Sequence, residues 1–128
     1  MWPRKRSLLL ASALAVALVA VSPRIFADEL GYENEVTVSG EVLDLTCYLA
    51  DGKKGSGHKA CAKLCAKKGL PMGLLTDDGE VYLLIENHDD PDPYDNLKNL
   101  AGSQVELKAV KYSRDGMSAL MVLESKGS

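Results

Sequence analysis

The sequence predicts an all-β protein with short helices, in which five strands form a Greek-key barrel. Apolar and polar residues alternate along segments of strand length, as in strands that bury one face. Asp78-Gly79 and Asp115-Gly116 mark tight turns between two pairs of these segments. A segment rich in glycine, lysine and cysteine interrupts the pattern after the first strand, and a helical insert is expected there.

The first strand is predicted over residues 35–46. Its apolar residues alternate up to Gly40 and change phase near Leu43, as in a long strand that bends at a glycine. After a flexible loop, a helix is predicted over residues 58–68, where alanine, leucine and cysteine predominate. Gly69 stands where a C-terminal helix cap belongs.

Two antiparallel hairpins are expected to supply the other four strands. The first joins residues 72–75 to 81–85, and the second joins residues 104–112 to 117–124. Between them, four aspartates and two prolines in residues 87–95 predict an exposed connection, followed by a short helix over residues 96–101. Five strands with a helix between the third and fourth follow the order of an OB-fold, a small Greek-key barrel.

Three motifs carry a resemblance to a group of known proteins. They are Val38-Ser39-Gly40-Glu41-Val42, Gly79-Glu80-Val81-Tyr82-Leu83-Leu84 and Leu100-Ala101-Gly102-Ser103-Gln104-Val105. Through them, residues 35–125 resemble small exported bacterial OB-fold proteins of poorly defined function. What departs from a plain OB-fold is the insert at residues 47–71, which holds all three cysteines and one of the two histidines.

Residues 1–27 are predicted to be an export signal. They contain a basic cluster at residues 4–6, an uncharged apolar run at residues 8–21, and Ala27, a small residue suited to cleavage. The apolar run is too short to span a bilayer comfortably, so no stable membrane insertion is expected after cleavage. The mature chain would be a single domain over residues 28–128, periplasmic or secreted.

Charge argues against nucleic acid as a partner. Loss of the leader would remove four of the 15 basic residues and none of the 18 acidic ones, leaving a net charge of −7 on the mature chain. Phosphate binding needs clustered positive charge. The leader also holds the only tryptophan and phenylalanine, so base-stacking side chains are scarce.

The insert contains four candidate metal ligands within 19 residues: Cys47, His58, Cys61 and Cys65. Helix residues three or four apart share a face, so His58, Cys61 and Cys65 are predicted to converge. Cys47, at the end of the first strand, would close the site from the rim of the barrel. Thiolates with an imidazole suit Cu(I), which we expect in an envelope compartment, and three thiolates with an imidazole also suit tetrahedral Zn(II).

The Cys61-x-x-x-Cys65 spacing, with a histidine nearby, is similar to the copper site of the Sco chaperones of cytochrome oxidase assembly. Sco proteins have a thioredoxin-like fold and a proline after the second cysteine, where this chain has Ala66. The resemblance therefore implies ligand chemistry and not the chaperone role. The predicted function is Cu(I) binding or delivery in the cell envelope, with a metal-donating or metal-receiving envelope protein as partner.

A structural disulfide is the alternative, since an oxidising compartment allows Cys47 to pair with Cys61 or Cys65. The protein would then be a non-catalytic envelope interaction module, and a redox-active thiol pair is a further reading. Metal binding is preferred because an unpaired thiol outside the cytoplasm is a liability. Enzymatic activity is not predicted, because the sequence has no phosphate-binding loop, nucleophile elbow or zinc-protease motif.

The leader generates a first testable prediction. Protein isolated from the cell envelope is expected to begin at Asp28 and contain 101 residues, because a signal peptidase would cut after Ala27. Intact-mass analysis measures this directly. A mature chain that still begins at Met1 would contradict export by cleavage.

Overall fold

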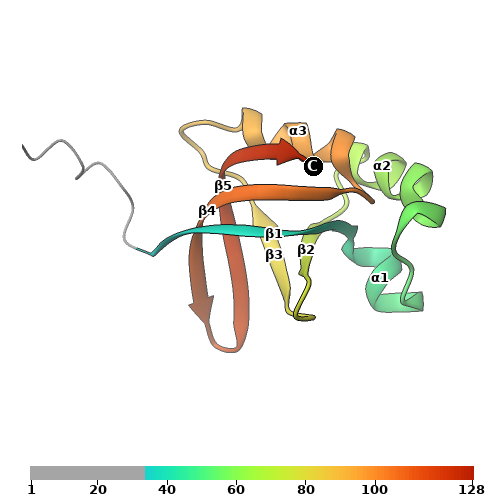
Figure 1. Ribbon diagram of the computed structural model, residues 1–128, viewed down its shortest axis with the longest axis horizontal. Coiled ribbons are helices and arrows are strands. Elements are labelled where there is room, and N and C mark those ends of the chain that lie inside the picture. The colour runs from blue at the N-terminus through green and yellow to red at the C-terminus, as the bar shows by residue number, and fades with distance from the viewer. Residues whose placement is uncertain (1–33) are drawn as a thin grey trace, which may run out of the picture.

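The computed structural model describes residues 34–128 and confirms the five-stranded barrel (Figure 1). The strands are β1 (Glu35–Asp44), β2 (Met72–Thr76), β3 (Val81–Ile85), β4 (Gln104–Arg114) and β5 (Met117–Gly127). The helices are α1 (Leu45–Asp51), the 3-10 turn η1 (Ser56–His58), α2 (Lys59–Lys67) and α3 (Asp92–Leu100). The predicted export signal at residues 1–27 lies outside the described residues.

The barrel closes because β1 pairs with two neighbours, in the order β1-β2-β3-β5-β4. Its residues 35–41 pair with β4 and its residues 40–44 pair with β2, both antiparallel, while β3 and β5 are parallel. Gly40 lies where the two pairings of β1 overlap. A Cβ atom there would lie 2.4 Å from the carbonyl oxygen of Leu75, so the close approach of β2 requires glycine.

Apolar side chains from every strand fill the barrel. Those that are almost completely buried include Val42, Met72, Leu74, Leu84, Leu107 and Leu120. Leu97 of α3 joins this core, and so do Ala62 and Ala66 of α2. Both α2 and α3 are therefore anchored to the barrel by their apolar faces, which fixes the position of the cysteines that α2 carries.

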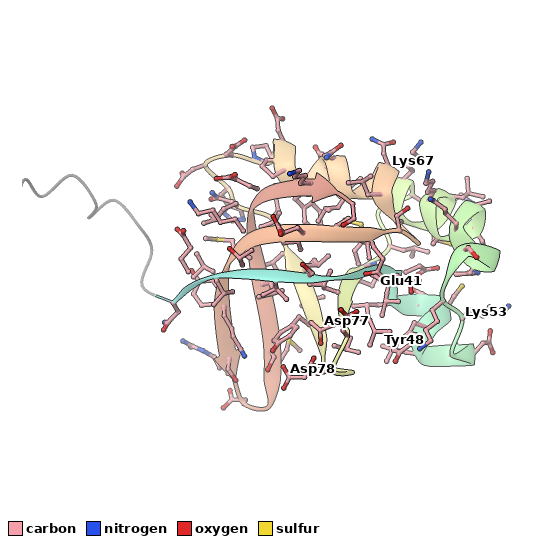
Figure 2. The ribbon with its side chains drawn as sticks, in the orientation of Figure 1. Glu41, Tyr48, Lys53, Lys67, Asp77 and Asp78 are labelled. Atoms are coloured by element: carbon pink, nitrogen blue, oxygen red, sulfur yellow. The ribbon has the colours of Figure 1, made fainter. Side chains whose placement is uncertain are left out.

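Both predicted hairpins are confirmed, and α2 matches the helix predicted over residues 58–68 to within one residue at each end. The turn of the first hairpin carries Asp77 and Asp78 (Figure 2). Gly69 has φ +87°, as expected of a residue that ends a helix in the left-handed conformation. None of the helices in residues 34–128 has the length and apolar character to cross a lipid bilayer.

Two predicted boundaries are wrong. The strand predicted to reach residue 46 ends at Asp44, where the chain turns into α1, so Cys47 lies on a helix. The connection predicted over residues 87–95 is helical from Asp92 onward, because Pro93 is tolerated in a first helical turn and Asp92 and Asp95 complement the helix dipole there. The short helix is therefore longer than predicted and ends at Leu100.

The crossing at Gly40 generates a stability prediction. Gly40→Ala is expected to lower the free energy of unfolding by about 1 to 3 kcal/mol, because the added Cβ forces β1 and β2 apart. Gly57→Ala is the control, since no atom lies within 4 Å of its added Cβ, and it should change stability by less than about 0.5 kcal/mol. Urea unfolding of the reduced protein measures both; equal effects would contradict the packing argument.

Candidate metal centre

The site is organised around Asp44, the last residue of β1, which is 1% exposed. Its Oδ1 atom accepts hydrogen bonds from the backbone N–H groups of Thr46 at 3.0 Å and Cys47 at 3.5 Å. These contacts cap α1, because the first N–H groups of a helix have no partner within the helix. Capping fixes the carboxylate at the barrel rim and starts the helix that carries Cys47.

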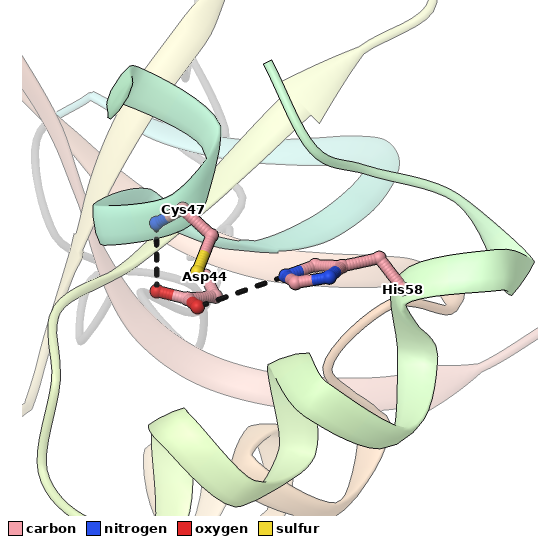
Figure 3. Close-up of side chains that lie close together, drawn as sticks. All are labelled: Asp44, Cys47 and His58. Carbon is pink, nitrogen blue, oxygen red and sulfur yellow. Dashed lines mark hydrogen bonds and ion pairs between the residues drawn. The ribbon is translucent and has the colours of Figure 1, made fainter. Parts of the chain in front are cut away.

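His58 approaches the same carboxylate from η1 (Figure 3). Its Nε2 atom lies 3.8 Å from Asp44 Oδ2, and its side chain is 12% exposed. Within residues 34–128, neither of these two buried atoms has a well-aligned hydrogen-bond partner. Buried polar atoms normally have one, so this pair is a place where a bound group would satisfy both atoms.

Cys47 completes the group. One ligand atom from each of Asp44, Cys47 and His58 lies within 4.8 Å of the other two. In a tetrahedral zinc site, bonds of about 2.0 Å to nitrogen and oxygen hold these ligand atoms about 3.3 Å apart. A contraction of a few tenths of an ångström would bring His58 and Asp44 to that spacing.

The Cys65 thiol interacts with Asp44 as well. Interaction with this carboxylate, which favours the proton-donating thiol over the thiolate, raises the pKa of Cys65 to about 11, and burial adds to the effect. The pKa of Cys47 is raised, mainly for the same reason. Burial alone would raise the pKa of the Asp44 carboxyl, but interactions with the two thiols and with backbone N–H groups outweigh it and lower that pKa.

Glu41 holds the loop that delivers His58. Its Oε1 atom, on β1, accepts a hydrogen bond from the N–H group of Gly55, and the carbonyl oxygen of Gly55 accepts one from His58 N–H at 3.1 Å. Gly55 has φ +78°, a conformation that side-chain-bearing residues rarely adopt. The glycine-rich loop is thereby tied to the barrel immediately before the histidine.

The structure brings together two of the four predicted ligands, since Cys47 and His58 lie in the group around Asp44. Cys61, which is exposed, and Cys65, which is half-buried and interacts with the same carboxylate, both lie outside that group. None of the three cysteines forms a disulfide. Asp44 was missed by the sequence analysis, although an aspartate just before Leu45-Thr46-Cys47 is a signal for a helix N-cap.

A scan against protein-family models, a search of curated proteins and a search of solved structures each find no match to this chain.

The contact between Asp44 and the thiols generates a prediction about reactivity. Asp44→Asn is expected to lower the pKa of Cys65 and to accelerate its alkylation at pH 8 by about tenfold or more, because loss of the carboxylate's charge makes the thiolate easier to form. Asparagine retains the helix cap, so α1 should persist. Peptide mass spectrometry after timed iodoacetamide treatment measures each cysteine, with exposed Cys61 as the internal control. An unchanged Cys65 rate would contradict the assigned cause.

Proposed function

We propose that this is an exported soft-metal-binding protein that holds one metal ion between α1 and α2. The observation that carries the proposal is the convergence of Asp44, Cys47 and His58, with two buried polar atoms that lack partners within the described residues. These ligands come from β1, α1 and η1, so the fold, and not local sequence, assembles them. The leader pattern of residues 1–27 supports an envelope location.

Cu(I) is our first choice of metal. Cys47 and His58 offer a thiolate and an imidazole, and Cys65, whose thiol interacts with the same carboxylate, would add a second thiolate; this donor set suits Cu(I). Asp44 would then remain outside the coordination shell and accept a hydrogen bond from the ring of His58. Carboxylates often orient metal-bound histidines in this way.

Zn(II) is the second choice, and the position of Asp44 is the specific observation that favours it. A carboxylate oxygen is a good ligand for Zn(II), and together with Cys47, Cys65 and His58 it would supply four donors for a tetrahedral ion. Asp44 would therefore have a different role with each metal. It would be a ligand to Zn(II), whereas with Cu(I) it would accept a hydrogen bond from the metal-bound His58 ring.

Delivery of the metal, rather than permanent retention, is supported by the exposure of Cys61. This thiol lies one helical turn before Cys65 on α2 and is accessible to another protein. A thiol at the opening of a metal site offers a ligand through which the ion is passed to or from a partner. We propose an envelope protein with its own thiol or imidazole ligands as that partner.

Metal titration tests the proposal. The reduced mature protein is expected to bind one Cu(I) or one Zn(II) and to melt at a higher temperature with the metal, because the ion binds only the folded chain. Cys47→Ser and His58→Ala should each lower the affinity by at least about 100-fold, more than is usual for outer-shell partners. His88→Ala is the matched control and should change neither property, because His88 is exposed and lies outside the group around Asp44.

Asp44→Asn distinguishes the metals. It should weaken Zn(II) binding as strongly as loss of Cys47, and Cu(I) binding by about 10- to 100-fold, as expected of an outer-shell partner. Unchanged melting temperatures with both ions would overturn the metal proposal. Thiol counting on protein isolated without reductant would then identify the disulfide-linked interaction module by its single free thiol.

A further inference from the structure

Charge is distributed very unevenly over the described chain. Residues 52–71 contain six lysines and no acidic residue, whereas the rest of residues 34–128 contains five basic and 15 acidic residues. Residues 52–71 of the insert are therefore strongly basic, although the whole protein has a net negative charge. We call the six side chains the lysine face: Lys53, Lys54, Lys59, Lys63, Lys67 and Lys68. Figure 2 shows Lys53 and Lys67 at the helical end of the molecule, apart from Asp77 and Asp78.

The lysine face is largely without ion-pair partners. Within residues 34–128, five of its six lysines form no salt bridge, and Lys53 contacts Asp51 at 3.7 Å with both side chains well exposed. On the barrel, Lys108 pairs with Glu35 at 3.0 Å, and the Lys111 ammonium group donates to the Tyr82 hydroxyl at 3.0 Å. The charges of the insert are therefore available to another molecule.

An exposed apolar side chain lies among these charges on α2. Leu64 is 55% exposed. Cys61, Leu64 and Lys68 follow one another at helical spacings of three and four, so an exposed thiol, an apolar group and a cation share one side of α2. Apolar groups surrounded by charges are typical of surfaces that bind proteins.

We propose that the lysine face, with Leu64, docks an acidic protein surface and brings the partner's own metal ligands to Cys61. Charge complementarity identifies the partner, because complementary charge speeds association and fixes its orientation. A lipid headgroup has neither thiol nor imidazole with which to receive a metal. The delivery step depends on the proposed function, but electrostatic docking does not.

A binding measurement with a defined acidic polypeptide tests the docking surface. The probe is a fluorescent 20-residue poly-L-glutamate, titrated by anisotropy with the reduced mature protein at low salt. Binding should weaken as salt screens the charges, and Lys67→Glu/Lys68→Glu should reduce the affinity by at least about tenfold, because Lys68 shares a side of α2 with Cys61. The probe should also slow alkylation of Cys61 in the unsubstituted protein, because that thiol shares a side of α2 with Leu64 and Lys68.

The matched control is Arg114→Glu/Lys126→Glu, which makes the same change in net charge on β4 and β5. It should change the affinity less than about twofold. Equal losses in the two double variants, or no protection of Cys61, would overturn the proposal. Binding of the lysine face to phosphatidylglycerol vesicles but not to poly-L-glutamate would also overturn it, in favour of a lipid surface, and binding to a DNA oligonucleotide alone would do so in favour of nucleic acid.

Metal titration of the same samples separates this inference from the proposed function. Poly-L-glutamate binding without any metal binding would retain the docking surface and reject the metal centre. Metal binding without poly-L-glutamate binding would retain the metal centre and reject the docking surface.

Discussion

The buried carboxylate of Asp44 joins the barrel to the helices that carry the cysteines. A charged group removed from water needs compensating partners, and one of its oxygens finds them in the N–H groups that begin α1. The other oxygen faces His58 and lacks a well-aligned donor within the described residues. Asp44 thus lies at the end of β1 and caps α1, and its carboxylate contacts or interacts with Cys47, Cys65 and His58.

The barrel gives this centre a rigid base. β1 pairs on both sides, and Gly40 permits the close crossing that lets the strand leave β4 and continue along β2 to Asp44. The insert is then fixed at three places: the cap at Asp44, the contact between Glu41 and Gly55, and the alanines of α2 in the core. Ligands from separate segments are held in position because each segment is attached to the same strand or the same core.

The apolar core and the lysine-rich insert lie in different parts of the molecule. The barrel contains most of the apolar core, while the insert contains the thiols and six lysines, five of which form no salt bridge within residues 34–128. This division lets the insert present an exposed thiol, exposed leucines and free positive charge without disturbing the packed strands. Functional residues are often placed in this way, on connections held by a rigid scaffold.

Local patterns in the sequence determined the strands, the hairpins and α2. Alternation of apolar residues and the Asp-Gly turns depend on neighbours a few positions away, and the structure follows them closely at β2, β3, β4 and β5. The same locality made Cys47, His58, Cys61 and Cys65 visible as candidate ligands, because residue type and spacing are properties of the chain alone.

Only the tertiary structure decided which of these candidates meet, and what joins them. α1 has only seven residues, so helix propensity in the sequence does not predict it, and its first turn depends on the N-cap at Asp44. Asp44 becomes a candidate ligand only because the strand pairing buries it and the loop held by Glu41 brings His58 to it. Cys61 and Cys65 look equivalent in the sequence, but the packing of Ala62 and Ala66 turns Cys65 toward Asp44 and leaves Cys61 exposed.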